Sequence, residues 1–171
     1  RRGLNVLCAM LGEKMEDLAP KIRAYREALD RNGHDPDAGR VSIMVHTCLA
    51  EDPESARANV VGPFTDYLRT HYHLLESLAR SMNLDVKLAD FSQDDLESLL
   101  KFGVEGFMNG RSLIGSPDSV RPVVQELADI GVDEIACLID FVQDYDLVMA
   151  GLPRIAELAQ ATARVRRMEL A

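Results

Sequence analysis

The sequence predicts an α/β fold in which parallel strands alternate with helices. Three runs of residues are almost continuously apolar, as expected for strands that are covered on both faces (residues 3–11, 40–50 and 132–141). Between and after these runs, apolar residues recur at the spacing of an amphipathic helix. Strands and helices that alternate in this way favour a parallel sheet with right-handed crossovers.

The first strand is expected in the run GLNVLCAML, residues 3–11, which ends just before Gly12. A helix is expected over residues 13–33, with Gly33 at the position of a C-cap. Pro20 lies inside this segment, and we expect it to limit or kink the first turn of the helix.

The second strand is expected over residues 40–50, where valine and isoleucine are frequent. Residues 51–83 have a helical pattern, which we expect to be interrupted near Gly62-Pro63 because neither residue favours a helix interior. Residues 88–115 indicate short helices and loop, with Ser92 as an N-cap. This connection is long for a compact domain, and long insertions of this kind are often functional.

The third unit has the clearest helix start in the chain. Ser116 is the expected N-cap and Pro117 takes the first helical position, which predicts a helix over residues 115–131. The run VDEIACLIDF, residues 132–141, is the third expected strand. A last helix is expected over residues 146–167, where the basic end suits the dipole at a helix C-terminus.

The strand count favours part of a larger fold over a complete domain. Three parallel strands would leave open edges, whereas they fit an arc of a (β/α)₈ barrel, which usually takes about 250 residues. A small doubly wound sheet is the alternative, but a flavodoxin-like domain should carry a phosphate-binding loop where residues 8–16 have one glycine and two acids. The chain begins at Arg1 without a methionine, and we expect it to be a piece cut from a longer polypeptide.

Composition limits the partners and the compartment. The chain has 171 residues, 47% of them apolar, and a formal net charge of −9, which makes nucleic acid and anionic membrane poor partners. No apolar stretch approaches the roughly 20 residues that span a bilayer. The three cysteines lie in apolar runs without a CxxC pair, which is typical of a reducing, cytoplasmic compartment (Cys8, Cys48 and Cys137).

Three polar residues end predicted strands at the edge where ligands bind. Parallel α/β folds bind their ligands at the carboxyl ends of the strands, and His46, Thr47 and Asp140 lie there. We take these three as candidate rim contacts. The simpler alternatives are that Asp140 caps its own loop and that His46 is a half-buried histidine with satisfied polar atoms.

Two further motifs carry weaker signals. The helix start at residues 115–117 could bind an anion through free N–H groups, although plain capping explains it equally simply. The motif HYH, residues 71–73, suggests a metal only weakly, because helical residues two apart point in different directions. We therefore predict no metal site.

Three long segments of the chain resemble a known enzyme family. They are GLNVLCAMLGEKMEDLAPKIRAYREALDRNGHDP, RVSIMVHTCLAED and SLIGSPDSVRPVVQELADIGVDEIACLIDF. Together they resemble the C-terminal half of the bacterial-luciferase-like FMN-dependent monooxygenases. The resemblance is closest to the subgroup embedded in nonribosomal peptide and polyketide synthases, and GVDEIACLIDF with the upstream GSP helix carries it most specifically.

The resemblance implies a fold, a cofactor and partners. The fold would be a TIM barrel, of which this chain supplies about the last three βα units, with a helical insertion or lid at about residues 62–114. The family uses reduced FMN, delivered by a separate flavin reductase, and O₂ to oxygenate a substrate. In the synthase subgroup, that substrate would be a carrier-tethered intermediate of natural-product biosynthesis. His46, Thr47 and Asp140 would then contact the flavin.

The resemblance also leaves a second function class open. We expect the isolated chain to be inactive, because oxygen activation needs an enclosed flavin and a partial barrel cannot exclude water. Its apolar edges should lead to self-association or to pairing with the missing N-terminal half. The alternative function is a non-catalytic structural or interaction module that docks onto neighbouring domains of a megasynthase.

Overall fold

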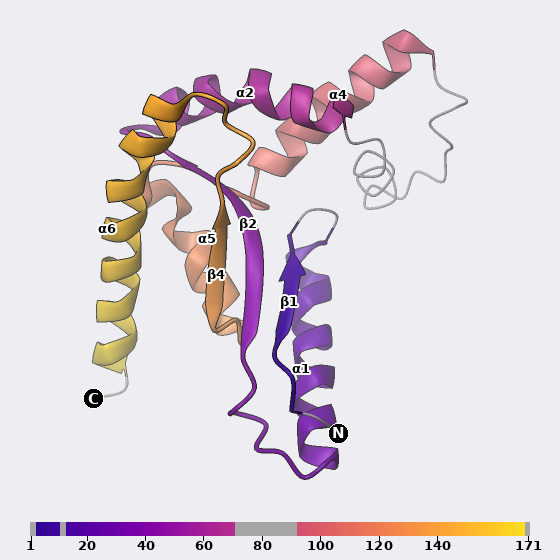
Figure 1. The fold of residues 1–171 in the computed structure, drawn as a ribbon, viewed down its shortest axis with the longest axis vertical. Coiled ribbons are helices and arrows are strands. Elements are labelled where there is room, and N and C mark those ends of the chain that lie inside the picture. The colour runs from indigo at the N-terminus through magenta and orange to yellow at the C-terminus, as the bar shows by residue number, and fades with distance from the viewer. Residues whose placement is uncertain (1–2, 11–12, 71–91, 170–171) are drawn as a thin grey trace.

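The chain folds into a parallel sheet with helices packed mainly against one of its faces (Figure 1). The computed structural model describes residues 3–10, 13–70 and 92–169. The strands are β1 Val6–Ala9, β2 Val41–Leu49, β3 Leu113–Gly115 and β4 Glu134–Leu138. The helices are α1 Met15–Arg31, α2 Pro53–Thr70, α4 Gln93–Met108, α5 Pro117–Asp129 and α6 Tyr145–Glu169.

The long strand β2 organises the sheet. Both β1 and β4 bond residues 42–44 of β2, so they must lie on opposite edges of it. The short strand β3 pairs with the last three residues of β2, from Thr47 to Leu49. Every pair is parallel, and the carboxyl ends of the strands therefore gather at one end of the sheet.

The side chains on the helix-covered face of β2 build the main core. Val41, Ile43 and Val45 alternate along the strand and are almost fully buried. They pack with apolar side chains of three helices: Leu18 and Ile22 of α1, Val124 and Leu127 of α5, and Leu158 of α6. Figure 1 shows α1 and α5 behind the strands and α6 along one side. Helices on one face of a parallel sheet are the arrangement expected of a barrel arc and not of a doubly wound sheet.

A second core lies beside the carboxyl ends of the strands. Helices α2 and α4 cross there (Figure 1) and pack on the segment after β4. This cluster contains Val60, Phe64, Leu68, Leu100, Val104, Phe107, Phe141 and Val142. The insertion after β2 is thus held by its own apolar core.

The structure confirms the strands and helix caps that the sequence predicts. Ser92 accepts a hydrogen bond from the Asp95 N–H, and Ser116 accepts one from the Ser119 N–H. Gly33 and Gly131 follow α1 and α5 with φ of 75° and 97°, a left-handed conformation that favours glycine. These residues fix where the helices begin and end.

Three expectations about local structure were wrong. Helix α2 continues through Gly62-Pro63, because Phe64 and Leu68 beyond them are buried and keep the helix docked. Residues 93–108 form one helix of 16 residues in place of several short ones. The strand β3 was not predicted, because three residues are too few to show a strand pattern.

The acidic start of the last strand has a structural purpose. The Asp133 carboxylate accepts hydrogen bonds from the Val41 N–H at 2.8 Å and from the Arg26 guanidinium at 2.7 Å. Arg26 also donates to the carbonyl of Pro36 at 2.7 Å. Asp133 therefore ties α1, β2 and the start of β4 together at the amino end of the sheet.

Among the described helices, none has both the length and the apolar character needed to cross a membrane.

Candidate functional site

The carboxyl ends of β2 and β4 bring two polar residues to the same end of the sheet. Leu138 pairs with His46 in the register, which places both on the inner face, the face of the sheet opposite the main core, and Asp140 follows in the turn after β4. Asp140 is exposed, whereas only 3% of His46 is accessible to solvent. The carboxylate of Asp140 raises the pKa of His46 through its charge, against the larger effect of burial.

Aromatic rings surround the His46 imidazole. Four rings meet it edge to face, with centroid distances from 5.1 to 5.6 Å (Phe64, Tyr67, Phe107 and Phe141). The rings come from α2, α4 and the segment after β4, so His46 is the point where the sheet meets the insertion. Phe64 and Phe107 also stack on each other at 4.5 Å.

This enclosure keeps His46 neutral. Burial lowers the pKa of His46 from 6.5 to about 4, and the nearby carboxylate of Asp140 opposes the shift. The buried Nε2 atom of His46 has no hydrogen-bond partner among the described residues. A buried nitrogen without a partner costs free energy. A ligand atom or a water that reached Nε2 and formed a hydrogen bond with it would offset that cost.

Tyr67 is a site residue that the sequence did not reveal. It is partly buried, stacks on Phe64 at 6.0 Å and meets His46 edge to face at 5.6 Å. Burial raises the pKa of the Tyr67 hydroxyl, and the charge of Asp140 raises it further. The signal in the sequence was the apolar spacing of Phe64, Tyr67 and Leu68 on one face of α2, which by itself indicates only packing.

Thr47 differs from the other two predicted contacts. It shares the side of β2 that Val45 and Leu49 occupy, the side opposite His46. Its side chain is buried, and its hydroxyl donates to the carbonyl of Val45 at 2.8 Å. The structure thus brings His46 and Asp140 together and turns Thr47 away from them.

The start of α5 is occupied by its own caps. Ser116 and Ser119 exchange side-chain and backbone hydrogen bonds, which satisfies N–H groups that an anion would need. Asp118 lies in the first turn and pairs with Arg121 at 2.5 Å, so a carboxylate already stands where an anion would approach. Capping is therefore the interpretation that the geometry supports.

Cysteines and acids in the described part of the chain form neither a reactive thiol site nor a metal site. Burial raises the pKa of the Cys8 and Cys48 thiols, which keeps both protonated. No group of three or more metal-ligating side chains occurs among the described residues. The HYH motif at residues 71–73 lies outside the described residues.

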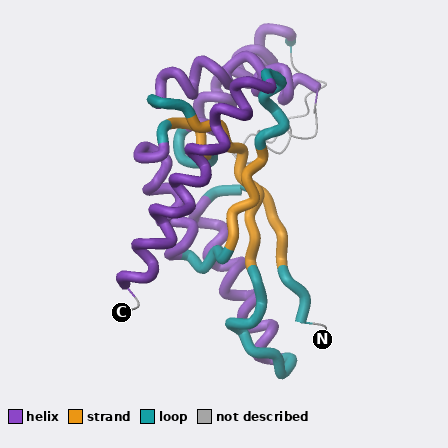
Figure 2. Tube along the Cα trace, turned by 60° about the vertical axis from the view of Figure 1, so that its left-hand side comes forward, coloured by secondary structure: helices purple, strands orange, loops and turns teal. Residues whose placement is uncertain are grey.

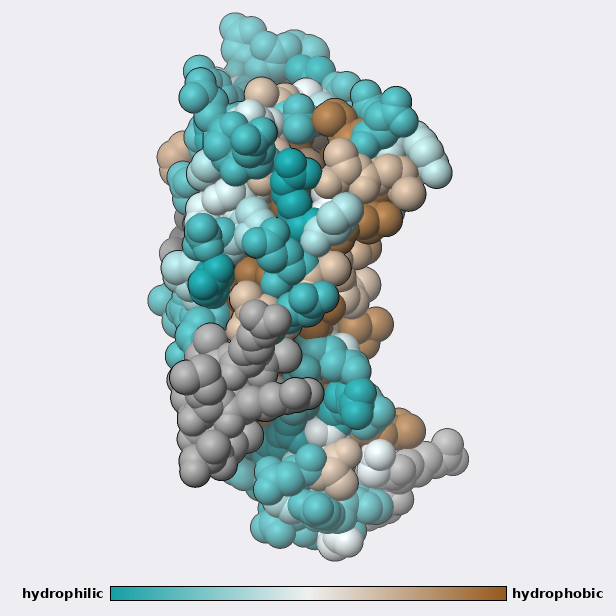
Figure 3. Space-filling model, turned by 90° about the vertical axis from the view of Figure 1, so that its left-hand side faces the viewer, coloured by the Kyte–Doolittle hydropathy of each residue, from teal (hydrophilic) through white to brown (hydrophobic). Residues whose placement is uncertain are grey.

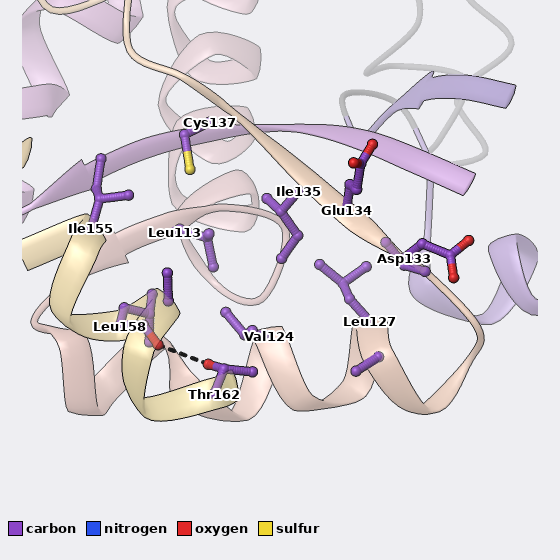
Figure 4. A pocket seen from close by; sticks show the side chains of 13 residues that line it. Leu113, Val124, Leu127, Asp133, Glu134, Ile135, Cys137, Ile155, Leu158 and Thr162 are labelled. Atoms are coloured by element: carbon purple, nitrogen blue, oxygen red, sulfur yellow. Dashed lines mark hydrogen bonds between the residues drawn. The ribbon is translucent and has the colours of Figure 1, made fainter. Parts of the chain in front are cut away.

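A cavity of about 370 Å³ lies on the other face of the sheet (Figure 4). Its wall is largely apolar and includes Ile135 and Cys137 of β4, Val124 and Leu127 of α5, and Leu158 of α6. Two acids at its edge are engaged elsewhere, Asp133 with Arg26 and Glu134 with Arg40. The cavity lies among the packed helices, on the face opposite His46.

Comparisons with known proteins found a family and two similar solved structures. The family model described as luciferase-like monooxygenase matches residues 1–134. The structure is similar to the monooxygenase RslO1 from Streptomyces bottropensis, with a TM-score of 0.58 and 16% identity over 94% of this chain. It also resembles the riboflavin lyase RcaE, solved with modified FMN and riboflavin, with a TM-score of 0.47 and 17% identity over 91% of this chain. A search of curated proteins found no match.

The matches cover part of a larger fold. This chain spans 42% of the RslO1 chain and 39% of the RcaE chain. The fold that RslO1 shares with it is consistent with a partial barrel. Because the family model covers residues 1–134, which is most of the chain, this chain belongs to the luciferase-like monooxygenase family.

Proposed function

We propose that this chain is the C-terminal part of a flavin-dependent monooxygenase barrel. The observation that carries the proposal is that His46 and Asp140 both lie at the carboxyl ends of neighbouring parallel strands, where barrel enzymes hold their ligands. Membership of the luciferase-like monooxygenase family supports the same reaction class. In this proposal the insertion at about residues 62–114 borders the mouth of the barrel and acts as its lid.

The polar groups at the rim suit one edge of a flavin. The exposed carboxylate of Asp140 would accept hydrogen bonds from a ring N–H or a ribityl hydroxyl. His46 is neutral, and its Nε2 has no hydrogen-bond partner among the described residues, so it would bind through a hydrogen bond and not through charge. Thr47 faces the other side of β2, and we assign it no direct contact. The described residues contain no phosphate cradle, and the FMN phosphate would be held by the remainder of the barrel.

The chain's other contribution is to shield the site. Bound reduced FMN supplies the electrons with which one oxygen atom of O₂ is inserted into the substrate. The aromatic cluster around His46 removes water from that side of the rim, as such chemistry requires (Phe64, Tyr67, Phe107 and Phe141). One arc of the barrel cannot enclose the flavin, so we expect this chain to bind FMN without turning over.

The remaining partners follow from the family resemblance of the three long segments. We propose that a separate flavin reductase in the cytoplasm supplies the reduced FMN. We further propose that the substrate is tethered to a carrier protein of a nonribosomal peptide or polyketide synthase. The formal charge of −9 supports neither a nucleic-acid nor a membrane partner.

Flavin binding tests this function. FMN, oxidised and then chemically reduced, is titrated into the chain while flavin fluorescence and absorbance are followed. We expect binding in the micromolar range that Asp140→Asn weakens by about 10-fold, the loss of one charge-assisted hydrogen bond. The matched control is Asp129→Asn at the far end of α5, which should bind as the parent does. If neither oxidised nor reduced FMN binds, the result contradicts the proposal and favours a non-catalytic module.

A further inference from the structure

The helix-covered face of the sheet holds a cavity that is bounded by elements of this chain. β4 forms one wall, and α5 and α6, the helices that come before and after it, form most of the rest (Figure 4). Figure 2 shows the helices of the main core on one side of the strands, so the cavity is separate from the open inner face. In Figure 4, the thiol of Cys137 points from β4 into this space.

Small side chains leave room between these elements. Cys137 of β4, Ala128 of α5 and Ala159 of α6 line the cavity at places where larger apolar residues would fill it. Its volume of about 370 Å³ lies within the range of roughly 300–1,000 Å³ that is usual for small-molecule pockets. Because an α-helix is about 10–12 Å across with its side chains, this space admits a small molecule and not a helix of a partner protein.

The wall of the cavity offers apolar contact and few polar groups. Ile135, Cys137 and Ile155 are only partly buried, so apolar surface inside the cavity meets water. The Thr162 hydroxyl already donates to the carbonyl of Leu158 at 2.9 Å. Water in such a space finds few hydrogen-bond partners, and covering the apolar wall with an apolar ligand is favourable.

Charge narrows the class of ligand further. The carboxylates of Asp133 and Glu134 lie at the edge of the cavity, and each is already paired with an arginine. None of the described residues that line the cavity is basic. An anionic group would therefore be buried without a partner, and a cationic group would have to compete with the two arginines. The cavity is suited to an uncharged molecule.

Completion of the barrel leaves this space open. In a (β/α)₈ barrel, the next strand is added at the edge of β4 that does not face β2, and the next helix packs beyond α6. The cavity lies between α5 and α6, on the side of the main core. The rest of the barrel is therefore added beside the cavity and does not fill it.

We propose that this cavity binds a small uncharged molecule built largely of hydrocarbon, at a site separate from the rim at His46 and Asp140. The inference rests on the walls of the cavity and not on the proposed flavin chemistry, and its test contains no flavin.

A neutral fluorescent probe tests the chemistry of the site. N-phenyl-1-naphthylamine is titrated into the chain, and we expect one probe per chain with a dissociation constant in the micromolar range. 1-Decanol should displace the probe. Ionised decanoate has the same chain length and should compete at least about 10-fold more weakly, because its carboxylate finds no basic partner. No binding, or equal competition by the two compounds, would overturn the proposal.

Two neighbouring positions of β4 locate the probe. Cys137 faces the cavity, and Ala136 faces the inner side of the sheet, where Figure 3 shows hydrophobic surface along its right-hand margin. Cys137→Phe should weaken probe binding by about 10-fold or more, since the new ring occupies the space. Ala136→Phe adds the same ring to the other face and should leave binding unchanged. Circular dichroism confirms that both variants are folded. Equal effects, or a loss of binding in Ala136→Phe alone, would place the probe on the inner face and overturn the proposal.

Alkylation of the parent chain gives a test without a substitution. 1-Decanol should slow the reaction of Cys137 with N-ethylmaleimide in proportion to the occupied fraction, which peptide mass spectrometry measures. Cys8 of β1 does not line the cavity, and its rate should not change. An unchanged rate at Cys137 would overturn the proposal. So would a probe that no longer binds after the first half of a family barrel is added, because that result would assign the space to the missing half.

Discussion

The imidazole of His46 stands edge-on to the ring of Phe107, with 5.1 Å between the ring centroids and 86° between the planes. This contact joins β2 to α4, which are separated in sequence by the whole of α2. Phe64 of α2 stacks on the same Phe107 ring at 4.5 Å. His46 therefore joins the aromatic core of the insertion to the sheet at the rim.

Removing the Phe107 ring should loosen the insertion. Phe107 is 1% exposed, and we expect Phe107→Ala to lower the free energy of unfolding by about 3–5 kcal/mol because it leaves a cavity. Phe102 lies in the same helix but is 63% exposed, so Phe102→Ala should change stability by no more than about 0.5 kcal/mol. Urea denaturation measures both variants. Equal losses would show that the aromatic cluster does not hold α4 in place.

His46 should make the protein less stable in mild acid. The pKa of His46 is about 4 in the folded state and 6.5 as the ordinary value, so the unfolded chain binds a proton first. Stability is complete above about pH 6.5 and is lost as the pH falls toward 4, by an amount on the order of 3 kcal/mol. The free energy of unfolding, measured from pH 7 to pH 4, should lose part of this slope in His46→Leu. An unchanged slope would mean that the pKa of His46 in the folded protein is close to its ordinary value.

Asp140 should control the titration of His46. Its carboxylate raises the pKa of His46 against the effect of burial, so Asp140→Asn should lower that pKa further. Nuclear magnetic resonance follows the His46 ring protons through a pH titration in both proteins. Asp129→Asn, on the helix-covered side at the other end of the sheet, is the charge-matched control. If the pKa of His46 is equal or higher in Asp140→Asn, the charge of Asp140 does not act on His46 as stated here.

Asp133 should stabilise the amino end of the sheet. Its carboxylate accepts from the Val41 N–H and the Arg26 guanidinium, and Asp133→Asn keeps the shape but removes the charge. We expect a loss of about 1–2 kcal/mol in the free energy of unfolding, since the Arg26 guanidinium loses its charged partner. Asp37→Asn, in an exposed turn, is the control. Thermal unfolding of the two variants at one pH distinguishes them.

Much of the fold was readable from local patterns. Ser92 and Ser116 begin helices as predicted, because side-chain capping depends on a few neighbouring residues. The run at residues 40–50 became β2 because valine and isoleucine on one side of it face the helices. By contrast, Pro63 did not break α2, because the tertiary burial of Phe64 outweighed its local effect.

The site was less readable, because its geometry depends on contacts between distant segments. The rule that ligands bind at strand ends selected His46 and Asp140, which lie at the carboxyl ends of β2 and β4. The same rule also selected Thr47, and only strand alternation in the actual register turns it away. The aromatic enclosure of His46 could not be predicted, since Tyr67 and Phe107 come from helices whose docking no local pattern specifies.

The most direct test of the central claim is to follow the His46 ring by carbon-edited nuclear magnetic resonance while FMN is added. The account predicts that the His46 signal shifts and saturates with the same dissociation constant that flavin fluorescence gives. The signal of His34, in the turn at the amino end of the sheet, should not move. Binding of FMN that leaves the His46 signal unchanged would place the flavin elsewhere and contradict the assignment of this rim as the cofactor site.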